Sequence, residues 1–417
     1  MKKLIRSVSA LLCILLMTGM IGCKKENEKP KTSSPSSGAS SGGDTSSADG
    51  TPYDNTPSDD STNSSIQNSN TASVSDVNTA VKPAAKTMTA AQGKGYFLVY
   101  PKVNHPGVAE MDASYEMTCT DKSGNAVTPE KLTYSTDNSS VKVKGNKITV
   151  PWSVRSSGRP LTVTAKANGT VKTGSYTFNF RQYTANPTFV EDFDVFDENI
   201  WEPANKEASV NAAGETVPAD RIGYVKDGKL VFHVKDEADA KKGRYEIITK
   251  DFNQAYGSFS ARIDMPKQGN ANAAFWMMTT NGRRYLKNPA MPSVSNGEID
   301  IVEYFPTWGE RLSAALHWYA WHPDYLASSG DDKIPALNIK KGYHIYSNVW
   351  TEDAIYWYYD GELVRTYTGP GTSAESAGMN LLLQLAPETK DGWGGKYDPK
   401  QYPYTMYTDW VRVYAFK

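Results

Sequence analysis

Three acidic residues stand close together in an otherwise apolar stretch of the chain. The stretch SNGEIDIVEYFP holds Glu298, Asp300 and Glu303 among isoleucines and a valine. Acidic residues are depleted from β-strands and are costly to bury without a partner. The pattern therefore indicates either a solvated strand face or a site that needs the carboxylates. Paired carboxyl groups can divide two roles between them, one staying ionised and the other holding a proton to donate.

The spacing of the three residues bears on whether they can act together. Strict alternation along a strand puts Glu298 and Asp300 on one face and sends Glu303 to the other. One extra residue, a β-bulge near Ile301 and Val302, would return Glu303 to the face of its two partners. The two glutamates could then lean to about 5 to 5.5 Å apart, which is the carboxyl spacing of a retaining glycosidase.

Residues 186–417, which contain this stretch, are expected to form strands throughout. Short alternating runs such as SFSARIDMP and AIYWYYDGELVRTYT follow one another, and no long amphipathic helix is indicated. The Asp360-Gly361 pair between IYWYY and ELVRTY is a strong hairpin signal. The predicted fold class is all-β, an antiparallel β-sandwich of the jelly-roll, concanavalin-like type.

The run Glu298-Ile-Asp300-Ile-Val-Glu303 resembles the active-site motif of glycoside hydrolase family 16, in the bulged form of its laminarinase-like and galactan-cleaving members. The resemblance extends over residues 187–417. It implies an endo-acting hydrolase of a β-linked polysaccharide that retains the anomeric configuration and needs no cofactor for catalysis. Supporting segments follow in family order: YGSFSARIDMP from Tyr256, AAFWMM from Ala273, DGELVRTY from Asp360, NLLLQLA from Asn380 and TDWVRVYAF from Thr408.

The resemblance also assigns roles to the three acidic residues. Glu298 is expected to be the nucleophile, Glu303 the general acid and base, and Asp300 a partner that holds Glu298 in place. These roles require environments that push the pKa values of the two glutamates apart.

Aromatic residues and one histidine are the candidates for sugar binding. Trp276 matches a family tryptophan near the cleaved sugar, and His317 follows the acidic strand at a place where the family often carries a histidine. Other tryptophans in the same half of the chain could stack on sugar faces: Trp308, Trp318 and Trp393.

A structural calcium ion is the metal that the resemblance implies. Asp192 in VEDFD and Asp409 in TDWVRV resemble positions that bind it in the family. Carboxylate oxygens are the ligands that calcium prefers. The histidines and cysteines show no spacing typical of zinc.

The substrate is left open between two classes of polysaccharide. We favour a β-1,3-glucan or a mixed β-1,3/1,4-glucan, because the bulged motif is common in laminarinase-like members. An endo-β-galactosidase acting on galactans or mucin-type glycans is the alternative, since the loop before Gly297 lacks a Trp-Pro pair and Gln384 stands where asparagine is common. A surface glycan-binding lipoprotein without catalysis is an alternative of another class, although a lectin has no need to keep both Glu298 and Glu303.

The N-terminal part predicts export and anchoring. Residues 1–22 have a basic start and a short apolar run typical of a signal peptide. The Gly22-Cys23 step resembles the lipobox of bacterial lipoproteins, so lipid on Cys23 would anchor the protein at the bacterial cell surface. Residues 23–88 are rich in Ser, Thr and Asn and predict a disordered tether. Residues 89–185 form short alternating runs and predict a small sandwich that resembles bacterial immunoglobulin-like repeats.

Composition limits the partners. Lys+Arg 45 against Asp+Glu 46 gives a formal net charge of −1, so no basic field for nucleic acid is expected. The expected partners are a polysaccharide and, through the lipid on Cys23, a membrane, and the protein is expected to be a monomer. Once Cys13 leaves with the signal peptide and Cys23 is lipidated, Cys119 has no disulfide partner and is expected to be a buried apolar side chain.

Overall fold

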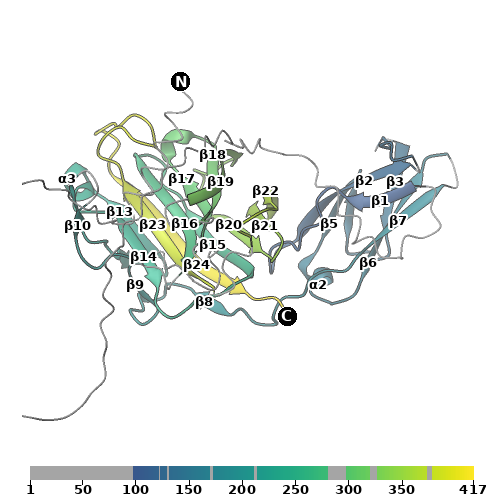
Figure 1. Ribbon diagram of the computed structural model, residues 1–417, viewed down its shortest axis with the longest axis horizontal. Coiled ribbons are helices and arrows are strands. Elements are labelled where there is room, and N and C mark those ends of the chain that lie inside the picture. Colours follow the sequence, from purple (N-terminus) through teal and green to yellow (C-terminus); the bar gives the residue numbers. More distant parts are fainter. Residues whose placement is uncertain are drawn as a thin grey trace, which may run out of the picture. The chain divides into compact units, whose positions relative to one another are not determined.

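The computed structural model describes residues 97–417 except for 122, 129–130, 170–171, 211–213, 280–296, 320–325 and 373–377. The predicted signal peptide, the tether and Cys23 lie outside the described residues. Regular structure in the described part is almost entirely antiparallel β-strand, which confirms the predicted all-β fold (Figure 1). None of the helices in this part is long and apolar enough to cross a membrane.

The first strands form two small sheets that share one core. One sheet has the order β1-β2-β5-β4 and the other β3-β6-β7. Alternate residues of β2 are buried, among them Cys119, which lies in this core as expected. The immunoglobulin-like kinship of this unit stays a prediction. Its elements are β1 (Phe97–Pro101), β2 (Ala113–Asp121), β3 (Leu132–Thr136), β4 (Lys142–Lys144), β5 (Lys147–Val150), α2 (Trp152–Arg155), β6 (Leu161–Ala167) and β7 (Thr173–Phe178).

Two larger sheets hold the acidic stretch. The first has the order β12-β13-β24-β15-β20-β21-β22 with β8 beside β24, and the second has the order β19-β18-β17-β16-β23-β14-β9. Their strands are β8 (Phe189–Glu191), β9 (Trp201–Pro203), β12 (Tyr224–Val225), β13 (Leu230–Val234), β14 (Tyr245–Thr249), β15 (Gly257–Asp264), β16 (Ala271–Thr279), β17 (Gly297–Tyr304), β18 (Arg311–Tyr319), β19 (Leu326–Pro335), β20 (His344–Trp350), β21 (Ile355–Tyr359), β22 (Glu362–Tyr367), β23 (Met379–Pro387) and β24 (Tyr404–Tyr414).

Alternation within these strands divides core from surface. On β16, Phe275 and Met277 join residues of the other sheet in one apolar core. Their neighbours Ala274 and Trp276 therefore point the other way. We call this outward side of the seven-stranded sheet the site face.

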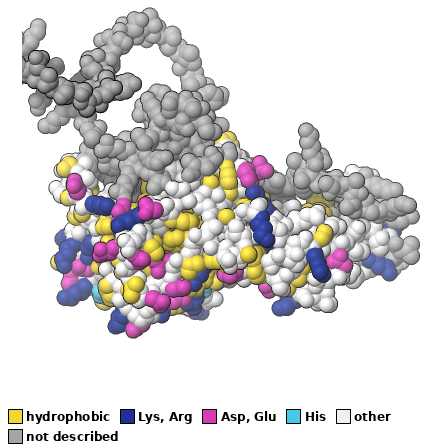
Figure 2. Space-filling view, turned by 90° about the horizontal axis from the view of Figure 1, so that it is seen from below, with side chains coloured by type: hydrophobic (Ala, Val, Ile, Leu, Met, Phe, Trp, Pro, Cys, Tyr) yellow, Lys and Arg dark blue, Asp and Glu magenta, His cyan; other side chains and the backbone are white. Residues whose placement is uncertain are grey.

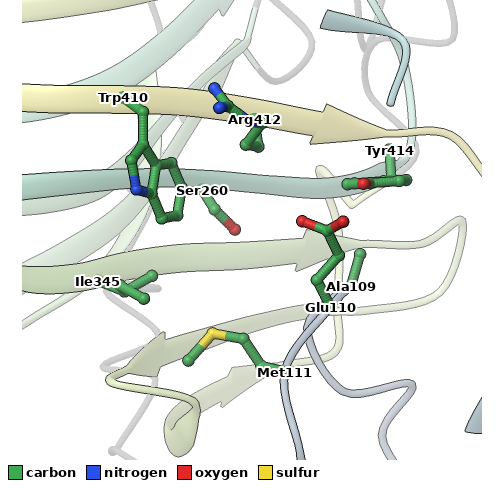
Figure 3. A pocket seen from close by; sticks show the side chains of 8 residues that line it. All are labelled: Ala109, Glu110, Met111, Ser260, Ile345, Trp410, Arg412 and Tyr414. Carbon is green, nitrogen blue, oxygen red and sulfur yellow. The ribbon is translucent and has the colours of Figure 1, made fainter. Parts of the chain in front are cut away.

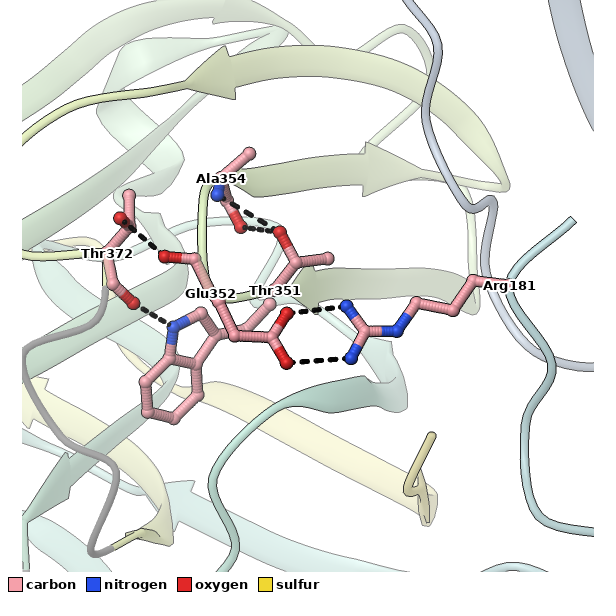
Figure 4. Close-up of polar contacts among 6 residues, drawn as sticks. Arg181, Thr351, Glu352, Ala354 and Thr372 are labelled. Atoms are coloured by element: carbon pink, nitrogen blue, oxygen red, sulfur yellow. Dashed lines mark hydrogen bonds and ion pairs between the residues drawn. The ribbon is translucent and has the colours of Figure 1, made fainter. Parts of the chain in front are cut away.

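The segment that joins the two sandwiches is tied to the second one by an ion pair. Arg181 donates to both carboxylate oxygens of Glu352, at 2.6 and 2.8 Å (Figure 4). The hydrogen bonds and charge of Arg181 lower the pKa of Glu352 to about 2. Half of the Glu352 side chain is exposed, so the pair positions the segment more than it stabilises the fold.

Strand β17 contains the predicted bulge. On the β16 side, Phe275 faces Val302 and Trp276 faces Asp300, which leaves Ile301 without an opposite residue. The pairing with β18 shifts at the same place. The extra residue returns Glu303 to the face of Glu298 and Asp300, as the sequence predicts.

A tryptophan from the opposite sheet supports the backbone at this bulge. The indole Nε1 of Trp357, on β21, donates to the carbonyl oxygen of Asp300 at 2.8 Å. Trp357 is 1% exposed, so this carbonyl is satisfied from within the core. The same ring lies under the guanidinium of Arg365, 4.4 Å from the ring centroid.

We expect Trp357→Phe to loosen the bulge as well as to destabilise the fold. The change leaves a buried carbonyl unsatisfied and a small cavity, which together cost about 2–4 kcal/mol. Amide hydrogen exchange should accelerate in β17. Trp350→Phe is the matched control, because Trp350 is equally buried and its Nε1 donates to Thr372 at 2.5 Å. A similar exchange pattern in β17 for both variants would contradict this role of Trp357.

Candidate active site

The three acidic side chains share the site face, and a histidine lies beside two of them. Across the ladder, Glu298 faces His317 on β18 and Asp300 faces Trp276 on β16. The Nε2 atom of His317 lies 3.1 Å from Oδ2 of Asp300. One carboxylate oxygen of Glu298, one carboxylate oxygen of Asp300 and one ring nitrogen of His317 all lie within 4.8 Å of one another. The structure thus assembles the cluster that the motif predicts and includes the predicted His317.

Asp300 is the centre of this cluster. It is 4% exposed, and its carboxyl group shares a hydrogen bond with Glu298 on one side and contacts His317 on the other. A group held from both sides fixes the orientation of its neighbours. Asp300 is therefore placed to position Glu298, whose side chain is only partly buried.

Glu303 has partners of its own. The side-chain amide of Asn272 donates to its Oε1 at 3.0 Å, and the Ser313 hydroxyl forms a further hydrogen bond. These two contacts come from the strands on either side, β16 and β18. The bulge thus separates two environments on one strand, one for Glu298 and one for Glu303.

Burial raises the pKa values of all three acidic groups, and the charge of Asp300 raises those of Glu298 and Glu303 further. For Glu298, burial raises the pKa most and the charge of Asp300 raises it further, while His317 opposes the shift. For Glu303, burial again has the largest effect and Asp300 the second, while the hydrogen bonds from Asn272 and Ser313 lower the pKa. Carboxylates this close cannot all be ionised, so the cluster retains a proton near neutral pH. A retained proton is what a general acid requires.

The predicted sugar-binding tryptophans fall into two groups. Trp276 lies on the site face opposite Asp300. Trp308 and Trp393 pack together just beyond Glu303, with ring centroids 5.0 Å apart, and Phe305 packs against both. Their role in sugar binding stays a prediction.

Trp318 does not belong with them, and the expectation that it forms a sugar platform is wrong. It follows His317 on β18, so alternation turns its ring toward the core. It is 9% exposed and packs in the main core beside Tyr367, at a centroid distance of 6.0 Å.

The two carboxylates expected to bind calcium do not fit a shared metal site. Asp192 forms an ion pair with Arg412. Asp409 forms one with Arg262 and lies 3.8 Å from the ammonium group of Lys229. Each carboxylate is already balanced by a cation, and in the described part of the chain neither belongs to a cluster of three metal-binding side chains.

A pocket elsewhere on the molecule contains none of the three acidic residues. It opens on the outward side of the eight-stranded sheet, where Ser260, Ile345, Trp410 and Tyr414 line it together with the Ala109–Met111 segment (Figure 3). Its one carboxyl group, that of Glu110, forms a hydrogen bond with Tyr414, so the lining lacks the pair of carboxyl groups that a retaining glycosidase needs. The chemistry therefore belongs to the site face.

Sequence reasoning missed a charged pair beside the cluster. Glu246 lies on β14, and Arg244 directly precedes this strand. The guanidinium of Arg244 donates to Oε1 of Glu246 at 2.9 Å. Burial raises the pKa of Glu246, and the charge of Glu298 contributes to the shift. The signal was an acidic residue inside the apolar strand YEIIT, the same kind of signal that marks the acidic stretch of β17.

Comparison with known proteins agrees with this geometry. Residues 219–412 match the family model of Glycosyl hydrolases family 16. A Beta-glucanase of Brevibacillus brevis is 34% identical over 227 residues, which cover 54% of this chain and 80% of that protein. The chain belongs to glycosyl hydrolase family 16.

Two further relatives match a smaller share of this chain. The Glucan endo-1,3-beta-glucosidase A1 of Niallia circulans is 29% identical over 215 residues, 46% of this chain and 30% of that protein. A Keratan-sulfate endo-1,4-beta-galactosidase of Sphingobacterium multivorum is 24% identical over 169 residues, 39% of this chain and 37% of that protein. The chain spans less than two thirds of the length of several relatives that it matches.

We expect Asn272→Ala to move the alkaline limb of the pH profile of kcat/KM to higher pH. The amide donates to Glu303 and lowers the pKa of this residue, so its loss raises that pKa and keeps the acid protonated further into the alkaline range. The shift should be on the order of half to one pH unit. Ser313→Ala should move the limb in the same direction. If the alkaline limb of the kcat/KM profile stays in place or moves to lower pH in both variants, Glu303 is not the group whose titration produces this limb.

Proposed function

We propose that this protein is an endo-acting, retaining hydrolase of a β-glucan with β-1,3 or mixed β-1,3/1,4 linkages. The observation that carries the proposal is the bulge at Ile301, which puts Glu298 and Glu303 on one face with Asp300 between them. The names of two relatives, a beta-glucanase and a glucan endo-1,3-beta-glucosidase, support glucan as the substrate.

In the first step, Glu303 protonates the glycosidic oxygen while the Glu298 carboxylate attacks the anomeric carbon. The bond to the leaving sugar breaks and an ester between Glu298 and the remaining glycan forms. In the second step, the deprotonated Glu303 takes a proton from a water molecule, whose oxygen attacks the anomeric carbon and releases Glu298. Asp300, held by His317, keeps the Glu298 carboxyl directed toward the sugar throughout.

The cellular setting is part of the proposal. The sequence pattern at Cys23 supports an exported protein that is lipid-anchored at the bacterial surface, where a polysaccharide would meet it. Charged side chains of both signs are interspersed over the part of the described surface that faces the viewer in Figure 2. The expectation that the protein is a monomer stays a prediction.

Release of reducing ends from a panel of polysaccharides tests the substrate. We expect release from laminarin or lichenan and little from agar, porphyran or mucin. Release only from the galactose-containing glycans would favour the endo-β-galactosidase alternative. No release from any of them by the folded protein would favour a glycan-binding protein without catalysis.

The variant Glu298→Gln tests the assignment of the nucleophile on whichever polysaccharide is cleaved. An amide cannot form the ester, so activity should fall by about a thousandfold or more. Glu362→Gln is the matched control, because Glu362 is an exposed acidic residue on β22 that pairs with Lys147. Unchanged activity in Glu298→Gln would contradict the assignment.

A further inference from the structure

The pocket on the outward side of the eight-stranded sheet lies apart from the acidic cluster, yet an indole, a carboxyl group, a hydroxyl group and a guanidinium group all line it (Figure 3). Its volume is about 220 Å³. Sites that enclose a drug-sized ligand hold about 300–1,000 Å³, so this pocket fits one small ring and leaves the rest of a longer ligand outside. Ser260 lies at its base, with Arg412 opposite it on β24 and Trp410 two residues before Arg412.

The hydroxyl group of Ser260 has a hydrogen to donate in this pocket. Ser260 is 6% exposed, and its Oγ accepts a hydrogen bond from the Ser347 hydroxyl at 2.8 Å. Within the described part of the chain, Ser260 donates no side-chain hydrogen bond in return. A buried donor without an acceptor destabilises a fold, so an acceptor brought by a ligand is favourable at this position.

The exposed side chain of Glu110 belongs to a segment that is fixed on both sides. Before it, the backbone amide of Ala109 donates to Oγ of Ser258 at 3.1 Å. After it, the buried guanidinium of Arg155 donates to the carbonyl oxygen of Met111 at 2.5 Å. Glu110 itself has a φ of 62°, a left-handed conformation that is uncommon for a residue other than glycine. Its carboxyl group is therefore held beside the pocket before a ligand arrives.

The charges around the pocket favour a neutral ligand. The guanidinium carbon of Arg412 lies 5.4 Å from the centroid of the Trp410 ring, and this guanidinium forms an ion pair with Asp192. The charge of Arg412 is therefore balanced, whereas Glu110 forms no ion pair with any described residue. The resulting negative charge disfavours an anionic ligand, and the nearby guanidinium disfavours a second cation on the indole.

Exposed aromatic rings continue from the pocket along the same side of the sheet. Trp410 and Tyr407 pair with residues of β15 that stand two positions apart, so their backbones are roughly 7 Å apart. Tyr224 shares a row across the strands with Tyr407, and Val231 lies between them. Tyr224 and Tyr407 are 48% and 37% exposed. Flat amphipathic rings spaced along a surface suit the successive sugar rings of a glycan chain.

We propose that this pocket, together with Tyr407 and Tyr224, is an auxiliary binding site for a neutral polysaccharide chain, on the side of the sandwich opposite to the acidic cluster. One sugar ring enters the pocket and packs on Trp410, while one of its hydroxyl groups donates to Glu110 and another accepts from Ser260. The inference rests on the proposed function for the kind of glycan, a β-glucan. It adds a second place where the enzyme holds the polysaccharide, which raises the effective concentration of the chain at the active site.

Affinity electrophoresis in gels that contain laminarin or lichenan tests the site apart from catalysis. The Glu298→Gln background leaves the glucan uncut and should be retarded. Adding Trp410→Ala or Glu110→Gln should raise the apparent Kd about fivefold or more, because the stacking ring or the charged acceptor is lost. With Glu298 intact, both variants should keep kcat/KM on a short oligosaccharide and lose activity several-fold on insoluble β-glucan. Tyr100→Ala is the matched control, because Tyr100 is a partly exposed aromatic residue on β1 outside the pocket, and it should change none of these quantities.

The outcomes separate this inference from the proposed function. A protein that cleaves no glycan, but whose retardation falls in both variants, would overturn the proposed function and support the auxiliary site. An active enzyme whose retardation is absent, or is unchanged in both folded variants, would overturn the auxiliary site alone. Equal losses of activity on the short oligosaccharide and on the insoluble glucan would also overturn it, since the two residues would then serve the active site. If Trp410→Ala does not fold, the retardation of Glu110→Gln decides by itself.

Discussion

The one-residue bulge in β17 is the constraint on which the rest of the site depends. Side chains on a strand alternate strictly, so three acidic residues spaced as Glu298, Asp300 and Glu303 cannot share a face without an extra residue. Ile301 supplies it, and the indole of Trp357 satisfies the Asp300 carbonyl at the irregular point. The core of the sandwich therefore supports the geometry of the site directly.

Bringing these carboxyl groups together has an energetic cost that the neighbouring residues partly offset. Burial raises the pKa values of Glu298, Asp300 and Glu303, which means that their ionised forms destabilise the fold near neutral pH. His317 contacts Asp300, and Asn272 donates to Glu303. The same low-dielectric surroundings that raise this cost also keep a proton on the cluster, which the proposed role of Glu303 as general acid requires.

Most of the site was predictable from the sequence because it depends on one strand. Alternation and spacing gave the acidic cluster and required the bulge, and alternation after His317 could also have placed Trp318 in the core. The contacts between side chains of different strands were not predictable. Asp192 and Asp409 pair with arginines brought in by sheet register, and Glu246 faces Gln384 on a strand that is far from it in the sequence. Such pairings have no local sequence signal.

The anomeric configuration of the first product tests most directly whether the bulge places Glu298 and Glu303 for a double displacement. Proton NMR can follow a cleavable β-glucan oligosaccharide with the wild-type protein before mutarotation mixes the anomers. Two glutamates acting from one strand face, with a covalent intermediate on Glu298, require the new reducing end to appear first as the β anomer. Appearance of the α anomer first would mean that water attacks directly, and would contradict this account of the site.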